Sequence, residues 1–156
     1  MLRVPIRELG IGAVATDGRI EPGDPLLAGL DVELNGPIEV TGRLQSTAEG
    51  DIVWHARLSG LGRATCRRCL ADVPVPLAIE VHALFSADPD ALDDPDVYPM
   101  AERATEIDVS AAVREEVALA MPAFCLCRDE CAGLCPKCGT DLNVGACACA
   151  ASARPV

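Results

Sequence analysis

The chain has 156 residues, of which half are apolar, and a formal net charge of -11 at neutral pH. This length suits one domain with a small appendage, and no segment approaches the roughly 20 consecutive apolar residues of a membrane helix. Binding to nucleic acid over a whole surface depends on Lys and Arg, so the excess of acid argues against it. The first eight residues break any apolar run with charges and a proline, which does not resemble an export signal. We therefore expect a soluble, cytoplasmic protein.

Alternating apolar residues predict a β-hairpin in the middle of the chain. Residues 1–36 give no clear pattern and are expected to form a short element and loops. In residues 38–45 and again in residues 52–59, apolar side chains recur at every second position, which is typical of a half-buried strand. Residues 48–51 between them read Ala-Glu-Gly-Asp, a composition that favours a turn.

A third strand is predicted from about Asp72 to Phe85, where apolar residues again alternate. Pro74 and Pro76 lack the N–H groups that a central strand needs, so the first half of this strand is expected at an edge. Residues 86–106 form an acidic, proline-containing stretch without a period, and are interpreted as an exposed loop.

An amphipathic helix is predicted over residues 108–121, with Asp108 as its cap and Pro122 ending it. The predicted fold class is therefore α+β: a small antiparallel sheet of about four strands, one covering helix and a C-terminal Cys-rich zinc knuckle. The predicted domains are residues 1–122 for the α+β part and residues 123–156 for the Cys-rich module, which ends in a short disordered tail.

Seven of the nine cysteines lie in the last thirty-two residues. In reducing cytosol, dense Cys-x-x-Cys spacing indicates metal or redox chemistry rather than disulfides. The strongest signal is Cys135-Pro136-Lys137-Cys138-Gly139, because two thiolates two residues apart can chelate one tetrahedral ion and Gly139 can adopt a positive φ. Zinc is the expected cofactor, as one or two ions. The candidate ligands are Cys127, Cys131, Cys135, Cys138, Cys147 and Cys149.

The spacing does not decide which of these six cysteines share an ion. Cys135 with Cys138 is the firmest pair, followed by Cys147 with Cys149. Cys127 and Cys131 could complete that site, join a second one with Cys66 and Cys69, or remain free, and Cys125 is expected to be an extra buried thiol. The spacing of Cys131, Cys135 and Cys138 also matches an iron–sulfur motif, but its place near the end of a short chain argues against a cluster.

Cys66 and Cys69 repeat the two-residue spacing far from the other cysteines. They could contribute to a second metal site. Alternatively they could form a thiol–disulfide redox pair, with Arg67 and Arg68 lowering the thiol pKa. Redox pairs of this kind usually precede a helix in a βαβ unit, and no such helix is predicted here, so an inert turn or a shared metal is favoured.

Two stretches of the chain have opposite charge. Residues 54–69 contain four arginines and no carboxylate, which makes them a candidate RNA-binding surface through Arg57, Arg63, Arg67 and Arg68. The loop of residues 86–106 is strongly acidic and is a candidate docking surface for a basic partner, through Asp88, Asp90, Asp93, Asp94 and Asp96. Both could also be ordinary solvated surfaces.

No pattern in the sequence indicates catalysis. There are only two histidines, His55 and His82, and each falls on a predicted strand. No nucleophile elbow, phosphate-binding glycine loop or His-Glu-x-x-His motif is present. We therefore expect no enzyme activity, no catalytic residue and no small-molecule substrate.

Three segments together resemble the bacterial YceD family. They are Thr65-Cys66-Arg67-Arg68-Cys69-Leu70, the run from Glu106 to Pro122, and the string CAGLCPKCGTDLN with Cys147 and Cys149 after it. The resemblance spans residues 38–149. Members of this family are named for accumulation of large-subunit ribosomal RNA, and are often encoded beside the zinc-ribbon protein L32 of that subunit.

The resemblance implies a non-catalytic role in ribosome biogenesis, supporting accumulation or processing of the large-subunit (23S) rRNA. Because the chain is acidic, we favour handling of a basic large-subunit ribosomal protein, with L32 as the candidate, and rRNA contacted directly or indirectly. The alternatives are a zinc-dependent module that binds rRNA through the four arginines, and a thiol redox protein that uses Cys66 and Cys69.

Overall fold

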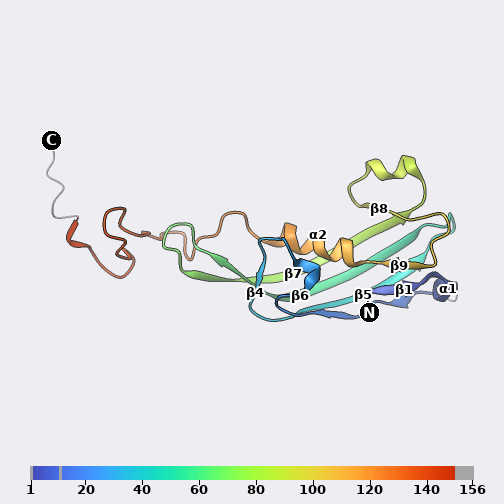
Figure 1. The fold of residues 1–156 in the computed structure, drawn as a ribbon, viewed down its shortest axis with the longest axis horizontal. Coiled ribbons are helices and arrows are strands. Elements are labelled where there is room, and N and C mark those ends of the chain that lie inside the picture. Colours follow the sequence, from blue (N-terminus) through green and yellow to red (C-terminus); the bar gives the residue numbers. More distant parts are fainter. Residues whose placement is uncertain (1, 11, 150–156) are drawn as a thin grey trace.

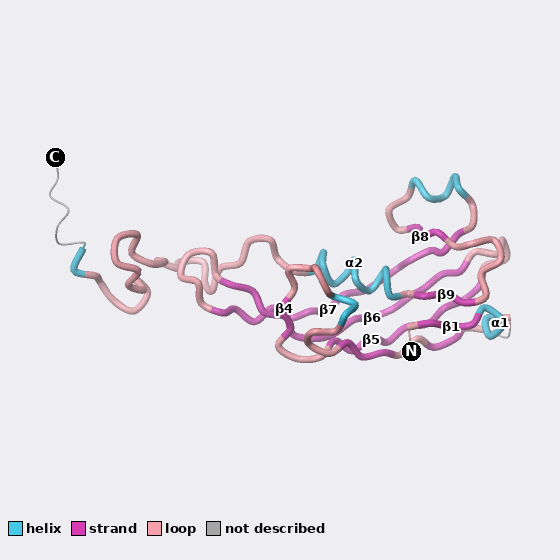
Figure 2. The backbone as a smooth tube through the Cα atoms, in the orientation of Figure 1, coloured by secondary structure: helices cyan, strands magenta, loops and turns pink. Residues whose placement is uncertain are grey.

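The computed structural model describes residues 2–10 and 12–149, and the expected disordered tail lies largely outside them. Figures 1 and 2 show an elongated molecule of strands with few helices, as the α+β prediction requires. Its strands are β1 (Arg3–Pro5), β2 (Val14–Ala15), β3 (Gly18–Ile20), β4 (Glu33–Leu34), β5 (Ile38–Ser46), β6 (Ile52–Thr65), β7 (Asp72–Ser86), β8 (Val97–Pro99) and β9 (Glu106–Asp108). Its helices are α1 (Ile6–Leu9), α2 (Ser110–Ala120) and the 3-10 turns η1 (Pro25–Leu27) and η2 (Pro89–Asp93).

The predicted hairpin forms the centre of the larger sheet. Strands β5 and β6 pair antiparallel from Glu39 opposite Ser59 to Ser46 opposite Ile52, and β7 pairs with the other side of β6. The alternation predicted from the sequence is confirmed, because one row of side chains on these strands is buried. That row contains Ile38, Val40, Leu44, Ile52, Trp54, Ala56 and Leu58.

The sheet is larger than the sequence indicated. It has seven strands rather than about four, in the order β2-β5-β6-β7-β8, with β3 also on β5 and β4 on β6. It is also not wholly antiparallel, since β8 runs parallel to the end of β7. A separate two-stranded sheet joins β1 to β9. The added strands have two or three residues each, too short for periodicity to reveal.

The acidic stretch of residues 86–106 is not an irregular loop throughout. It contains η2, β8 and the first residue of β9. Asp88 and Asp94 help to order it, because each side chain accepts a hydrogen bond from the backbone N–H two residues later. Such local hydrogen bonds do not require apolar residues at regular spacing. The search for hydrophobic periodicity therefore predicted no helix or strand in this stretch.

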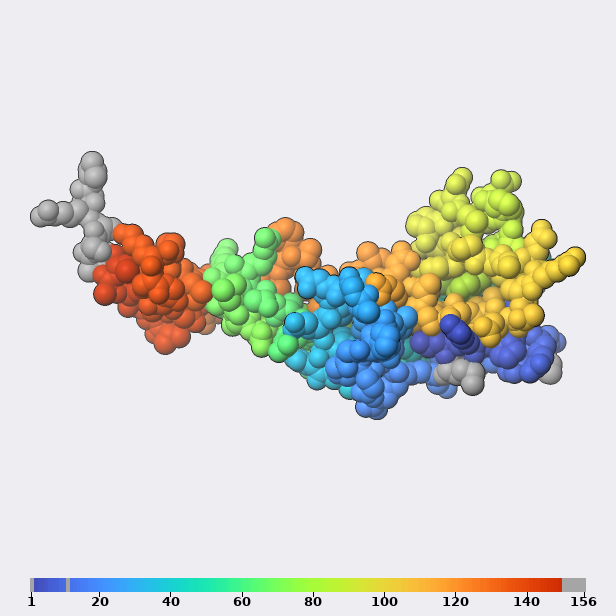
Figure 3. Space-filling view, viewed as in Figure 1, coloured from blue at the N-terminus to red at the C-terminus, as the bar shows by residue number. Residues whose placement is uncertain are grey.

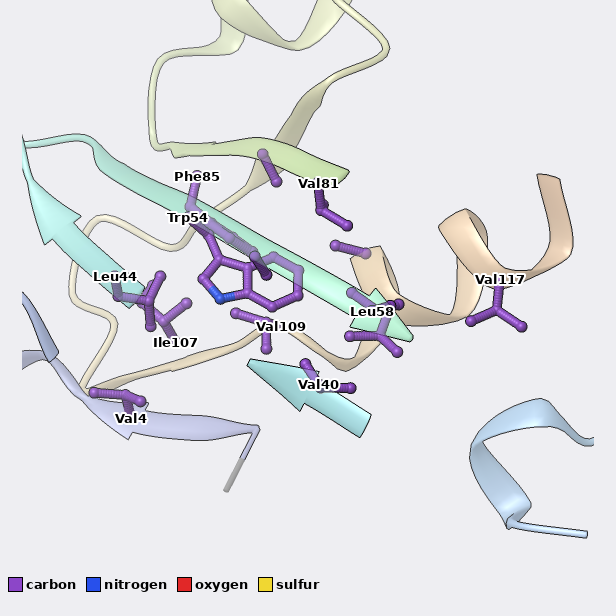
Figure 4. Close-up of a cluster of buried hydrophobic side chains, with 14 of the residues drawn as sticks. Val4, Val40, Leu44, Trp54, Leu58, Val81, Phe85, Ile107, Val109 and Val117 are labelled. Carbon is purple, nitrogen blue, oxygen red and sulfur yellow. The ribbon is translucent and has the colours of Figure 1, made fainter. Parts of the chain in front are cut away.

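Helix α2 covers the buried face of the sheet, and Figure 4 shows its Val117 facing the same core as Leu58, Val81 and Trp54. Val109, Val113 and Val117 are fully buried, as their spacing predicted. The sequence predicted Asp108 as the cap, but the N-cap is Val109, which makes no side-chain cap hydrogen bond. Asp108 lies one residue earlier and accepts a hydrogen bond from the N–H of Ser110 at 2.9 Å, which forms a local turn before the helix. Among the described residues, no helix is long and apolar enough to span a membrane.

Trp54 lies in this core and forms a buried side-chain hydrogen bond with Thr16. Its indole N–H donates to Thr16 Oγ1 at 2.7 Å, and neither residue is exposed to solvent. Gly42 lies over this bond: a Cβ atom there would come within 2.7 Å of Thr16 Oγ1 and 2.8 Å of the Trp54 nitrogen. The strand therefore needs glycine at this position for reasons of space.

Strands β6 and β7 are longer than the other strands, so their hairpin extends beyond the rest of the sheet. Its distal part and the segment after α2 extend away from the body, and residues 123–149 lie at that end of the molecule (Figures 1 and 3). The acidic stretch around β8 lies at the opposite end (Figure 3). This shape separates the cysteines from most of the acidic charge.

Replacing Thr16 with valine should destabilise the fold by about 1–3 kcal/mol, because the shape is kept but the buried indole N–H loses its acceptor. Thr16→Ser keeps the hydroxyl and is the matched control. Urea unfolding followed by Trp54 fluorescence measures both. Equal stability of the two variants would contradict the importance of this bond.

Candidate metal centre

The first cysteine pair lies in a tight turn at the tip of the β6–β7 hairpin. The N–H of Cys66 donates to Ala71 O at 2.8 Å, and the N–H of Leu70 donates back to Cys66 O at 2.9 Å. Leu70 closes the turn with φ +60°, a left-handed conformation that is costly for a residue with a branched side chain. The turn thus places both cysteines at the tip, beyond the last pair of the β6–β7 ladder.

The second cysteine pair adopts the same turn. The N–H of Cys135 donates to Thr140 O at 2.8 Å, and the N–H of Gly139 donates to Cys135 O at 2.9 Å. Gly139 has φ +73° at the position equivalent to Leu70. The two Cys-x-x-Cys turns are therefore equivalent in backbone hydrogen bonding, although they lie far apart in the sequence.

The structure gathers eight cysteines into two groups of four. Cys66 and Cys69 lie with Cys127 and Cys131, whereas Cys135 and Cys138 lie with Cys147 and Cys149. We call these the hairpin tetrad and the C-terminal tetrad. Within each, all sulfur atoms lie within 4.8 Å of one another. Each tetrad therefore offers four ligand atoms to one metal ion.

Sulfur distances in the hairpin tetrad fit a tetrahedral ion. Cys66 Sγ lies 3.8 Å from Cys131 Sγ, and Cys69 Sγ lies 3.6 Å from Cys127 Sγ. A tetrahedral ion with metal–sulfur bonds of about 2.3 Å separates its sulfurs by about 3.8 Å. Both contacts join the hairpin tip to the segment after α2, so a shared ion would cross-link distant parts of the chain.

Backbone contacts align the two segments of the hairpin tetrad. The N–H of Arg67 donates to Cys125 O at 3.0 Å, and the N–H of Leu134 donates to Arg68 O at 3.1 Å. The Arg68 guanidinium also donates to Cys131 O at 3.0 Å. Gly133, with φ +74°, allows this approach, since a Cβ atom there would lie 3.0 Å from Arg68 O.

Asn143 is not a ligand candidate, but it forms hydrogen bonds that hold the Cys131 part of the hairpin tetrad in place. Its side-chain oxygen accepts hydrogen bonds from Arg128 at 2.7 Å and from the N–H of Ala132 at 2.8 Å. Its amide nitrogen donates to Cys131 Sγ at 3.5 Å. Hydrogen bonds of this kind orient metal ligands. The sequence analysis missed this residue, although it ends the Cys-rich string from which the family resemblance was drawn.

Each tetrad contains thiols whose pKa values are shifted in opposite directions. The backbone N–H of Cys69 lowers the pKa of Cys66 to about 6, whereas the hydrogen bond with the Cys131 side chain raises that of Cys127 to about 12. In the C-terminal tetrad, Thr140 lowers the pKa of Cys138 to about 6, and contact with Cys138 raises that of Cys149 to about 11. Four thiolates this close repel one another, and a divalent cation would relieve that repulsion.

Cys125 belongs to neither tetrad. It is half-buried rather than buried as expected, and its backbone carbonyl rather than its sulfur joins it to the hairpin through Arg67. It is therefore a natural control position among the nine cysteines.

The four arginines of the candidate RNA-binding surface are largely engaged within the chain. Arg57 pairs with Glu80, and Arg63 pairs with Glu33 at 2.6 Å and Asp72 at 3.4 Å. Arg68 is bound to backbone carbonyls of the cysteine module, and Arg67 lies over the Phe124 ring at 4.2 Å from its centroid. The first two arginines therefore present little net charge to a partner.

The acidic candidate surface differs in this respect. Its carboxylates are exposed and form no ion pair with any residue that the structure describes. They are Asp88, Asp90, Asp93, Asp94 and Asp96. His55 and His82 lie elsewhere, on the exposed face of the sheet, with their Nδ1 atoms 2.7 Å apart.

Residues 54–155 match the family described as large ribosomal RNA subunit accumulation protein YceD. The chain belongs to the YceD family. It is 29% identical over 102 residues to an uncharacterized protein of Mycobacterium tuberculosis, covering 64% of this chain and 49% of that protein. It is 30% identical over 116 residues to the uncharacterized protein YlbN of Bacillus subtilis, covering 73% and 66%. The chain thus spans about half the length of the mycobacterial relative. No solved structure matches it.

The equivalence of the two turns yields a test. Leu70→Gly should stabilise the chain by about 1 kcal/mol, because glycine adopts a positive φ without a steric penalty. Gly139→Ala should destabilise the chain, because alanine is disfavoured at the positive φ of this position. Urea midpoints of the purified variants measure both effects. A loss of stability in Leu70→Gly would mean that the exposed Leu70 side chain makes a contact worth more than the strain.

Proposed function

We propose that this chain is a non-catalytic factor that supports accumulation and processing of large-subunit rRNA by binding a basic ribosomal protein of that subunit. The family description supplies the link to large-subunit rRNA. The candidate partner is L32, as the family resemblance implied. Zinc ions in the two tetrads would have a structural role, since all four ligands of each come from the chain and leave no open coordination position for substrate.

The observation that carries this proposal is the imbalance of the two charged surfaces. Two of the four arginines of the candidate RNA-binding surface, Arg57 and Arg63, form ion pairs with carboxylates of their own chain. The carboxylates of the acidic surface form no ion pair with a described residue. An uncompensated acidic surface attracts a basic partner, and it repels RNA. A basic ribosomal protein outside the ribosome is a partner of this chemistry.

One observation supports the alternative function, direct binding of rRNA. Phe124 is 75% exposed and stacks against Arg67 beside the hairpin tetrad, and exposed aromatic rings with arginine can stack on unpaired bases. Arg67 and Arg68 then replace the full set of four arginines as the residues to test. The redox alternative is weaker, because the sulfur contacts of Cys66 and Cys69 run to Cys131 and Cys127.

The deciding experiment isolates the tagged protein from its own host with and without nuclease treatment. Mass spectrometry and RNA sequencing then identify what is recovered. Nuclease-resistant recovery of a basic large-subunit protein supports the proposal. Recovery of precursor rRNA, with ribosomal proteins lost after nuclease, would instead favour direct rRNA binding.

Charge neutralisation tests the acidic surface itself. The triple variant Asp90→Asn, Asp93→Asn and Asp96→Asn should weaken the complex with L32 by about tenfold or more at low salt, and less at high salt, because screened charges contribute less. Its charge-matched control is Glu8→Gln, Asp31→Asn and Glu49→Gln, three exposed sites elsewhere. Calorimetry measures both. Equal affinities of the two triple variants would remove the acidic surface from the proposal.

Metal content tests the tetrads. The protein purified under reducing conditions should contain two zinc ions per chain by elemental analysis. The pair Cys66→Ser with Cys131→Ser should contain one, and Cys125→Ser should keep two. Zinc binding to metal-free protein should also release protons at neutral pH, because thiols such as Cys127, with its pKa raised to about 12, must ionise to become ligands. Retention of two ions by the double variant would contradict the assignment.

A further inference from the structure

Strand β7 has an open edge between its two ends. It pairs with β6 along its whole length, from Asp72 to Phe85. On its other side, β8 pairs only with residues 84–86. Among the described residues, no backbone hydrogen bond joins residues 73–83 to any element other than β6. The intervening stretch therefore lacks a second neighbour.

Two hydrogen bonds near the C-terminal end of β7 show which of its backbone N–H and C=O groups point away from β6. Backbone N–H and C=O groups of successive strand residues point alternately to the two sides. The N–H of Leu84 donates outward to Asp96 O, and Ser86 O accepts outward from Met100. The even-numbered residues therefore face away from β6, which gives Ala78, Glu80 and His82 unpaired N–H and C=O groups at the edge.

The prolines obey the same alternation. Pro74 and Pro76 are even-numbered, so their missing N–H groups fall on the outward side, where no ladder bond is lost. Natural sheets protect their edges with prolines, charges or covering segments. Here prolines protect one end of β7 and β8 covers the other, while residues 77–83 have neither. The open part can therefore accept a strand.

Acidic side chains gather at the β8 end of this edge. Tyr98 of β8 donates a hydrogen bond to Glu115 of α2 at 2.8 Å, which places that flank of the helix beside β8. Burial together with the charges of Asp96 and Glu115 raises the pKa of Glu116. None of these three carboxylates forms an ion pair with a described residue. An occupant of the edge should therefore carry positive charge.

An exposed apolar side chain, Leu119, lies on the same flank of α2. Leu119 is 74% exposed and lies three residues after Glu116, so the two share one side of the helix. Arg114 points to the other flank, where it donates to Leu26 O. An added strand would meet Leu119 and Glu116 with one set of its alternating side chains, and Glu80 and His82 with the other.

We propose that an extended, basic segment of a partner protein adds as a strand to the open edge of β7 at residues 77–83. This proposal rests on the function proposed above and names the place where the basic ribosomal protein binds. Backbone hydrogen bonds to Ala78, Glu80 and His82 supply the affinity, and the carboxylates beside the edge select for lysine and arginine.

The test is Ala78→Pro in the full chain. It continues the Pro74-x-Pro76 pattern at an outward position that is 4 residues after Pro74, so folding should be preserved. It removes one edge N–H and places a ring in the path of an added strand. Binding of L32, measured by calorimetry, should weaken by about tenfold. Ala78→Thr keeps the N–H and is the matched control, with affinity close to that of the unchanged protein.

Hydrogen exchange separates failure of this proposal from failure of the proposed function. The amides of Ala78, Glu80 and His82 should exchange rapidly in the free chain and be protected when L32 is bound. A tight complex in which these amides stay unprotected, or in which Ala78→Pro binds normally, would overturn the edge as the docking site while leaving the proposed function standing. Absence of any complex would overturn both.

A second copy of the chain is the competing occupant. Pairing of β7 with β7 of another copy would protect the same amides in the free protein, more strongly at higher concentration. Light scattering would then report a dimer that Ala78→Pro converts to a monomer, and this outcome would overturn a basic partner as the occupant.

Discussion

The arrangement of the whole cysteine-rich end depends on the meeting of the hairpin tip with the segment that follows α2. Cys66 lies 65 residues before Cys131 and Cys69 lies 58 residues before Cys127, yet all four sulfur atoms lie within 4.8 Å of one another. Only a few backbone bonds reinforce this contact, and the residues around it are largely exposed. A metal ion held by each tetrad would stabilise a module with so little apolar core more than burial does. The long β6–β7 hairpin brings one half of this candidate metal site to the other half.

This dependence separates the molecule into two ends of different chemistry. Residues 61–71 and 123–149 together contain five cationic residues and three carboxylates, so the negative charge of the chain lies almost wholly on the sheet, helix and acidic stretch. Under the proposed function, the acidic body is the part that would attract a basic protein. A zinc ion held by four thiolates has a net negative charge, so with both tetrads loaded the cysteine end would be weakly acidic rather than basic.

The central hairpin and α2 could be predicted from the sequence because their burial repeats with a period. Ile52, Trp54 and Leu58 alternate, and Val109, Val113 and Val117 recur each helical turn, so a local pattern reports the long-range core. The short strands β2, β3, β4 and β8 have no room for a period, and their pairing is decided by the longer strands that they join. Candidate ligands were recognised from spacing alone, but their division into two tetrads was left as one of three alternatives. That division depends on where the hairpin tip lies in space, which no local pattern encodes.

In the proposal, the open β7 edge lies between the two ends of the molecule. Pro74 and Pro76 close the edge on the side of the cysteine module, and β8 closes it on the side of the acidic stretch. A strand added between them would run alongside α2, with its cations nearest Asp96, Glu115 and Glu116, and its other end would point toward Arg67 and Phe124 beside the hairpin tetrad. A basic ribosomal protein bound in this way would shield the carboxylates that otherwise repel rRNA. Under the proposed function, binding of the protein would therefore lower the electrostatic barrier to rRNA approach, and the proposal favours protein binding before RNA binding.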